Sequence, residues 1–257
     1  MHTPSISMII AYVPMSLTKA MPITELTADS SSAMNAASLL KLLTLSSTAL
    51  PIGAYCYSQG VESAIECGLI VNEKNALAYF EDVLDLLLVR YELPMLARLI
   101  HAAKSAATQP HEFIRLASDY KASRETREFL LESQQLAFSL NAWIKQVLGL
   151  EVQVESHYGF VPVYAQLCAR LKLQPQDCLT AYCFSVLENQ VLAAVKTVPL
   201  GQMSGQRILW QLHQRMPEAI QQALNLQDAK QPLSSNLPNF AMLSMQHENQ
   251  YSRLFRS

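Results

Sequence analysis

The chain has 257 residues, of which 50% are hydrophobic and 16% are charged, and its formal net charge is -2. This length allows one large domain or two small ones with a substantial buried core. The near-neutral charge provides no basic surface of the kind that nucleic acids require, so we expect no nucleic-acid partner. The five cysteines include no Cys-x-x-Cys pair, which argues against structural zinc and a disulfide framework and favours reduced thiols in the cytoplasm.

Residues 1–37 are rich in Ser, Thr, Ala and Met and lack hydrophobic periodicity. We expect them to form a mobile N-terminal extension, with Met34 as an alternative start of the protein. The apolar stretch over residues 8–13 is short, is followed by Pro14 and has no Lys or Arg before it, so it does not predict a signal peptide. No apolar run is long enough to predict a membrane span.

A short buried helix is expected over residues 39–45, and it leads into an organising turn over residues 51–62. Pro51 fixes its backbone angle φ and Gly53 frees it, so the two predict a forced turn. Ser58 is placed to cap the next helix, and Glu62 lies in its first turn, where the helix dipole favours a carboxylate. The residues assigned to the organising turn are Pro51, Gly53, Tyr55, Tyr57, Ser58, Gly60 and Glu62, with both tyrosine rings expected to pack inward.

Beyond the turn, apolar residues recur three and four positions apart in every long segment, which is the spacing of one helix face. The helix that ends at Gly149 is expected to be the longest, Ser204 to cap the last helix, and Pro217 to kink or restart it. Residues 228–239 contain prolines and serines and predict a linker. The expected helices span residues 39–45, 77–91, 94–103, 113–120, 124–148, 158–173, 175–198 and 204–224.

This pattern predicts an all-α fold, a single-domain bundle of about eight to ten helices. The expected organisation is an extension over residues 1–37, a helical domain over residues 38–227, and a linker with a C-terminal docking tail over residues 228–257.

Residues that could carry catalysis are scarce. Glu81, Asp82 and Asp85 resemble half of the magnesium site of helical isoprenoid synthases, but no second acidic cluster is present to complete it. No two histidines have metal-ligand spacing, no glycine-rich phosphate loop occurs, and no Gly-x-Ser-x-Gly motif is present. We therefore predict no catalytic residues, no metal ligands and no directly bound cofactor.

Three other groups of residues suggest contacts with partners. Arg124 and Arg127 open the long helix, where cations oppose the dipole, so they are candidates for a structural or partner contact. Lys196 lies at a helix end and, with Arg207, marks a small basic site beside an exposed corner. The tail combines apolar groups with arginines, as the cores of protein interfaces do. The corner comprises Pro199, Leu200, Gly201 and Gln202, and the tail residues are His247, Tyr251, Arg253, Leu254, Phe255 and Arg256.

Four stretches resemble the UreF family of urease accessory proteins. Residues 50–62 resemble its Pro-x-Gly-x-aromatic-x-aromatic-Ser-x-Gly-x-Glu signature, and the other matches occur in family order over residues 123–127, 196–202 and 245–257. The resemblance covers residues 39–257, while Ala54 and Cys56 occupy variable positions of the signature.

The resemblance implies a dimeric helical scaffold in the cytoplasm that performs no catalysis. Its implied partners are the accessory protein UreD (also called UreH), the GTPase UreG and apo-urease, with nickel handled by the complex. The resemblance assigns the tail to UreD, and the region of Lys196, Pro199, Gly201, Gln202 and Arg207 to UreG. A magnesium-dependent isoprenoid-type enzyme and a helical adaptor unrelated to nickel remain as alternatives.

Overall fold

The structure is a computed structural model that describes residues 34–105, 110–198, 200–228, 233–234, 237–248, 250 and 253–256. Residues 35–257 form one compact unit. Of the extension predicted over residues 1–37, residues 1–33 lie outside the described part, whereas Ala36 and Ala37 already begin the first helix. Every regular element in the described residues is helical, which confirms the all-α prediction.

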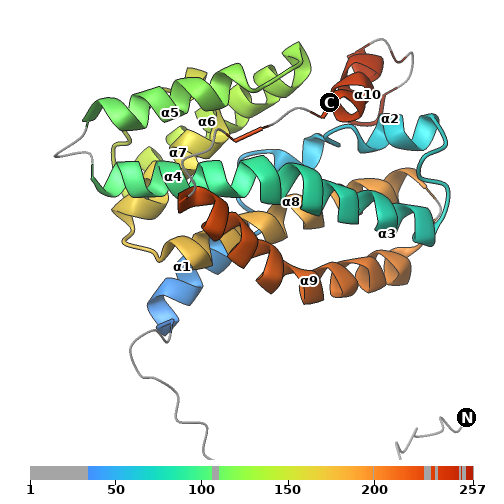
Figure 1. The fold of residues 1–257 in the computed structure, drawn as a ribbon, viewed down its shortest axis with the longest axis horizontal. Helices are drawn as coiled ribbons and strands as arrows, with labels where there is room; N and C mark the ends of the chain where they lie inside the picture. The colour runs from blue at the N-terminus through green and yellow to red at the C-terminus, as the bar shows by residue number, and fades with distance from the viewer. Residues whose placement is uncertain are drawn as a thin grey trace, which may run out of the picture. The chain divides into compact units, whose positions relative to one another are not determined.

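A continuous helical rod crosses the unit (Figure 1). It consists of α3 (Glu73–Asp82), the π-helical η2 (Val83–Glu92) and α4 (Leu93–Lys104). The N–H of Leu93 bonds to the carbonyl of Leu88, five residues back, so the helix is locally widened where Pro94 follows. This wider turn, together with the position of Pro94 in the first turn of α4, lets the rod pass the proline without a break.

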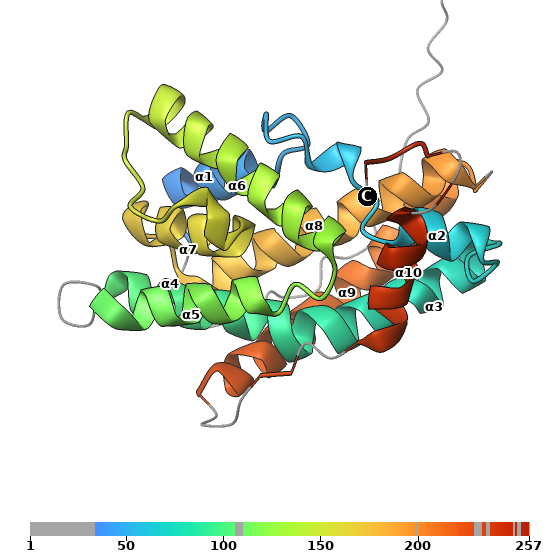
Figure 2. The same ribbon diagram turned by 90° about the horizontal axis from the view of Figure 1, so that it is seen from above.

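The remaining long helices pack against this rod or against one another (Figures 1 and 2). Helices α7 and α9 pack against α4, α6 packs on α7, and α8 packs along α9. Helix α10 packs against α2 and α6, which brings the end of the chain back to the organising turn. The bounds of these helices are α2 Val61–Glu66, α5 Pro110–Ala122, α6 Arg127–Leu148, α7 Phe160–Arg170, α8 Pro175–Thr197, α9 Gln202–Asp228 and α10 Pro238–Glu248, with short 3-10 turns at η1 Ala54–Cys56 and η3 Ser156–Tyr158.

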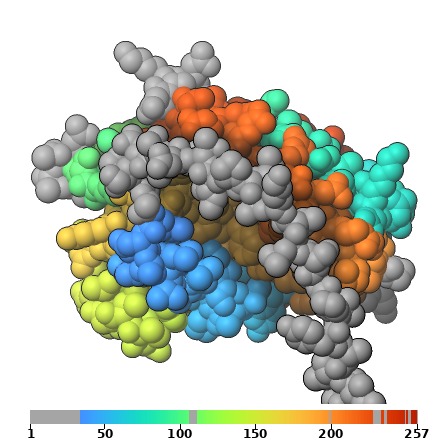
Figure 3. All heavy atoms as spheres, turned by 90° about the horizontal axis from the view of Figure 1, so that it is seen from below, coloured from blue at the N-terminus to red at the C-terminus, as the bar shows by residue number. Residues whose placement is uncertain are grey.

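Helix α1 (Ala36–Ser46) packs on α8 through only part of its leucine-rich surface. Leu42 and Leu45 are buried, whereas Leu39, Leu40 and Leu43 are exposed. The prediction of a buried helix is therefore wrong for three of its five leucines, because one face of α1 meets the bundle and the other lies on the surface (Figure 3).

Several helix ends differ from the expected positions. Helix α6 starts at Arg127 because the Thr126 side chain accepts the N–H of Phe129 at 3.1 Å and caps the helix there. The end at Gly149 is confirmed, since this glycine has a left-handed φ of 63°. With 22 residues, α6 is shorter than the 27-residue α9, so the prediction that it is the longest helix is wrong.

Helix α9 starts at Gln202 and runs through Pro217, so Ser204 lies inside the helix and does not cap it. The predicted linker over residues 228–239 falls partly outside the described residues, and its last two residues already belong to α10. Helix α8 is long and apolar enough to cross a membrane, but 56% of the relevant stretch is buried inside the unit. Core helices of soluble proteins meet the same criterion, so this is weak evidence for a span.

Candidate partner-docking site

The organising turn is shaped by consecutive left-handed residues. Gln59 and Gly60 have φ values of 53° and 83°, and α2 begins only after them. Ser58 is buried and its Oγ accepts the N–H of Glu62 at 3.4 Å, but it stands too far ahead of α2 to be the predicted N-cap. The ring of Tyr57 is buried while that of Tyr55 is 56% exposed, so the expectation that both rings pack inward holds only for Tyr57.

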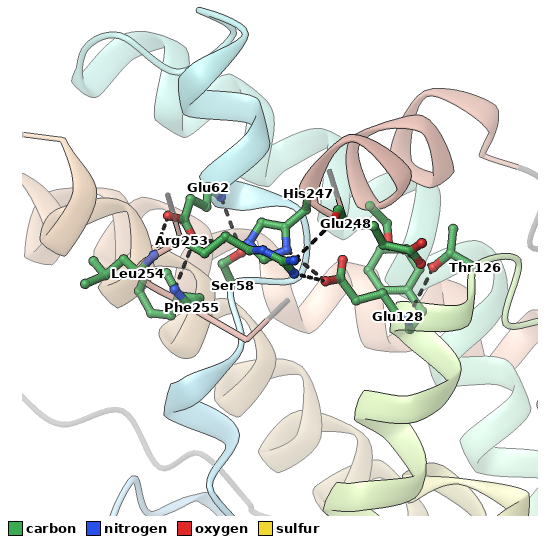
Figure 4. Close-up of polar contacts among 11 residues, drawn as sticks. Ser58, Glu62, Thr126, Glu128, His247, Glu248, Arg253, Leu254 and Phe255 are labelled. Atoms are coloured by element: carbon green, nitrogen blue, oxygen red, sulfur yellow. Dashed lines mark hydrogen bonds and ion pairs between the residues drawn. The ribbon is translucent and has the colours of Figure 1, made fainter. Parts of the chain in front are cut away.

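The C-terminal segment binds directly to this turn (Figure 4). The backbone N–H groups of Leu254 and Phe255 donate to the Glu62 carboxylate at 2.7 and 3.0 Å. The N–H of Arg256 donates to the carbonyl of Cys56 at 2.8 Å. Since hydrogen bonds to a carboxylate are stronger than neutral ones, Glu62 is the main anchor of the segment.

This anchoring buries one of two neighbouring apolar residues and exposes the other. Phe255 is 8% exposed and belongs to the main hydrophobic core, whereas Leu254 is 63% exposed. Phe255 packs into the chain's own core because the hydrogen bonds to Glu62 fix the backbone so that its ring faces inward. Removal of residues 247–257 would empty the core position of Phe255, so we expect it to lower the stability of the protein.

His247 connects the segment to two helices. It is fully buried, with Nδ1 2.9 Å from Glu128 Oε1 and Nε2 3.1 Å from Glu62 Oε2. The Arg253 guanidinium approaches Glu128 at 3.5 Å and donates to the carbonyl of Glu248 at 3.1 Å. The two carboxylates lie on opposite nitrogens of the ring, and within the described ranges no group of three or more His, Cys, Asp or Glu could hold a metal ion.

A polar cavity of about 500 Å³ lies between the segment and α6. Arg256 bonds to the hydroxyl of Tyr57 there; burial raises the pKa of this tyrosine, and Arg256 opposes the shift. Glu132, on the cavity wall, accepts the side-chain amide of Gln59 at 2.7 Å. The lining residues are Tyr57, Arg127, Glu128, Leu131, Glu132, Gln135, Glu248, Arg253 and Arg256.

The two candidate arginines near α6 have different environments. Arg124 forms a 2.7 Å ion pair with Glu92, with side chains 13% and 5% exposed, and lies 4.4 Å from the centre of the Tyr120 ring. Tyr182 donates to the same Glu92 at 2.9 Å, and burial followed by the charge of Glu92 raises the pKa of its hydroxyl, so it remains a donor. Arg124 is therefore a core residue, whereas Arg127 is exposed on the cavity wall.

The region assigned by resemblance to the GTPase lies beside the same segment. Lys196 is in the last turn of α8, with Nζ 6.0 Å from the centre of the Phe255 ring. Gly201 and Gln202 are exposed at the start of α9, and Gly201 has a left-handed φ of 72°. Pro199 and Tyr251 lie outside the described residues.

Arg207 is held by an acidic residue of another helix. Its guanidinium donates twice to Glu73, at 2.8 and 2.6 Å, and this lowers the pKa of Glu73 to about 2. The charge of Arg207 is thus locally balanced, and Lys196 is the less compensated cation of the predicted basic site.

Two functional carboxylates were not singled out from the sequence. Glu92 and Glu128 carry no distinguishing local pattern in the sequence, and only their burial reveals their contacts. Two of the acidic residues that resemble half of a magnesium site contact a cation of another helix. Arg215 of α9 lies 3.0 Å from Glu81 and 2.7 Å from Asp85, so these partly exposed carboxylates join two helices.

Comparisons with known proteins agree on one family. The profile of the UreF family matches residues 70–213. The urease accessory protein UreF of Ralstonia pickettii is 40% identical over 87% of this chain and 99% of its own length. That of Azoarcus sp. is 39% identical over 85% of this chain and 95% of its own length. The bifunctional urease accessory protein UreEF of Bordetella bronchiseptica is 39% identical over 100% of this chain and 59% of its own length.

Proposed function

The chain belongs to the UreF family of urease accessory proteins, and from this premise we propose that it is a non-catalytic scaffold in the nickel-delivery complex of urease. It would bind UreD through its C-terminal segment and UreG through the end of α8 and the start of α9. It would act in the cytoplasm as a homodimer on apo-urease, with nickel handled by the assembly and no cofactor bound by this chain.

The observation that carries the proposal is the way the C-terminal segment is presented. Three backbone hydrogen bonds hold the segment on the organising turn, so its outward side chains are ordered before any partner arrives. Leu254 is 63% exposed beside two arginines that line a cavity. A preordered apolar residue flanked by arginines favours binding, because less conformational entropy is lost when the partner docks.

The two proposed partner surfaces are neighbours in space. Lys196, on the UreG side, lies 6.0 Å from the ring of Phe255, on the UreD side. A partner that shifts the segment would therefore change the surroundings of Lys196 directly. The UreEF relative, whose name joins two accessory functions, supports a role for this chain within a larger accessory assembly.

The test is co-expression with candidate UreD and UreG, followed by size-exclusion chromatography. We expect Leu254→Asp to abolish association with UreD, since a charge replaces the exposed apolar contact, and Lys196→Glu to weaken the complex with UreG, most at low salt. Met242→Asp, at another exposed apolar position, serves as the matched control. Normal UreD binding by Leu254→Asp would contradict the assignment of the tail.

Arg207 requires a separate variant, because Arg207→Glu would add repulsion against Glu73 besides removing the positive charge. Arg207→Gln removes the charge without adding repulsion. Since Glu73 already balances this arginine, we expect Arg207→Gln to weaken UreG binding less than Lys196→Glu does.

A further inference from the structure

The buried imidazole of His247 lies where four parts of the protein meet. The ring comes from α10, Glu62 from α2, Glu128 from α6, and the backbone of residues 254–255 completes the cluster (Figure 4). We call His247, Glu62 and Glu128 the tail latch.

Both ring nitrogens lie at hydrogen-bonding distance from carboxylate oxygens, at 2.9 and 3.1 Å. An ionised carboxylate can only accept hydrogen bonds, and a neutral imidazole has only one N–H to donate. A neutral ring would therefore point one lone pair at a buried carboxylate. The imidazolium form, with two N–H donors, satisfies both contacts.

The charges around the ring agree with this assignment. Glu62 and Glu128 carry two negative charges, Arg253 of the segment supplies one positive charge at 3.5 Å from Glu128, and the imidazolium supplies the second. On α10 itself, the neighbouring Glu248 is exposed and contributes its backbone carbonyl to Arg253. Without the imidazolium proton, the cluster would keep an uncompensated negative charge in a buried site.

Glu62 links this protonation to the position of the segment. The Oε2 atom that faces the imidazole also accepts the N–H of Phe255, and Oε1 accepts the N–H of Leu254. We propose that His247 is a positioning residue whose protonated ring orients Glu62 to hold the C-terminal segment, so that the docked segment is released as pH rises. Its consequence for UreD binding rests on the function proposed above, whereas the docking of the segment does not.

Glu128→Gln provides a variant that separates this latch from ordinary packing. An amide nitrogen in place of Glu128 Oε1 can donate to Nδ1, while a neutral ring still donates from Nε2 to Glu62. Both ring nitrogens of His247 then have hydrogen-bond partners without the extra proton, although the ion pair between residue 128 and Arg253 is lost. Glu62→Gln cannot do the same, because its amide nitrogen would face the N–H of either Leu254 or Phe255.

The experiment uses the full chain labelled with 4-fluorophenylalanine, with the fluorine NMR signal of Phe255 assigned by Phe255→Leu. The signal reports docked and released segments between pH 6 and 9. For the unmodified chain we expect the docked-to-released ratio to fall with pH, by up to about tenfold per unit for one linked proton. Glu128→Gln should keep the segment docked with little pH dependence, and Glu248→Gln should behave like the unmodified chain.

His247→Gln should shift the ratio toward release by about tenfold or more at pH 6 and remove its pH dependence. A segment that stays docked in His247→Gln, or a pH dependence that persists unchanged in Glu128→Gln, would overturn the proposal. These readings need no partner, so they stand apart from the proposed function. Pull-down of UreD by the unmodified chain and by His247→Gln at pH 6 then tests whether the docked segment is the form that UreD binds.

Discussion

Glu92 and Arg124 form an ion pair inside the bundle. Both side chains are largely buried, so water could hardly solvate the charge of one residue if the other were removed. The Glu92 side chain is 5% exposed and receives a hydrogen bond from Tyr182, while Arg124 lies over the ring of Tyr120. Removal of one partner from such a pair leaves a buried charge, which costs far more than the pair itself contributes.

We expect Arg124→Met to lower the free energy of unfolding by about 3–5 kcal/mol, measured by urea denaturation. The double variant Glu92→Leu, Arg124→Met should recover much of this loss, because no charge is left unpaired. Arg127→Met is the matched control on the exposed side and should change stability by less than about 0.5 kcal/mol. Equal effects of Arg124→Met and Arg127→Met would contradict a core role for Arg124.

Gly159 occupies a backbone conformation that other residues rarely adopt, with φ 97° and ψ -179°. An added Cβ would lie 2.5 Å from Oγ of Ser133, the atom that accepts the N–H of Phe160. We therefore expect Gly159→Ala to destabilise the protein by about 2–3 kcal/mol. Gly149→Ala, where an added Cβ meets nothing within 4 Å, should lower the free energy of unfolding by only about 1 kcal/mol. Thermal melts of the two variants would measure this difference.

Among the elements, α10 and the segment after it are as much part of the fold as of the docking surface. His247 and Leu243 of α10 are buried, and Phe255 joins the core next to Lys196 of α8. The segment therefore stabilises the bundle with its inward residues and presents its outward residues to a partner.

This division predicts that substitution of Phe255 lowers stability, whereas substitution of the adjacent Leu254 weakens partner binding. Phe255→Ala should destabilise the protein by about 3 kcal/mol, because it empties a core position. For a domain of this size the melting temperature should fall by about 2–4 °C per kcal/mol. Leu254→Ala should leave the melting temperature within about 2 °C of the unmodified value and reduce UreD binding instead. A melt that responds equally to both variants would contradict the orientation of the segment.

At the scale of the whole molecule, residues 35–257 hold the core within one compact unit. The rod of α3, η2 and α4 touches α5, α7, α8 and α9, so most of the bundle depends on it. Among the described residues, α1 combines an exposed leucine face (Leu39, Leu40 and Leu43) with the buried Leu42 and Leu45.

A chain that begins at Met34 should retain this unit. We expect the same melting temperature, within about 2 °C, and the same association with UreD and UreG, since the core of the described residues is built from side chains between Leu42 and Phe255. Circular dichroism melts and size-exclusion chromatography would check both. A truncated chain that aggregates or loses its partners would show that residues 1–33 contribute to the fold or to an interface.

The sequence by itself determined the helical class, the succession of the long helices and the family, because hydrophobic spacing and short motifs are local signals. It located the end of α6 at Gly149 and the first-turn position of Glu62 for the same reason. It misplaced the starts of α6 and α9, because the first residue of a helix depends on which nearby side chain caps it or on where the preceding turn ends.

Only the tertiary structure decided which polar residues are buried and what they meet. Glu62 and His247 are 185 positions apart, and Glu128 and His247 are 119 positions apart, so no local pattern could pair them. The same holds for Leu254 and Phe255, which are alike in sequence but face opposite ways once Glu62 fixes their backbone. Burial and pairing depend on the packing of distant helices, and this is why the site emerged from the fold.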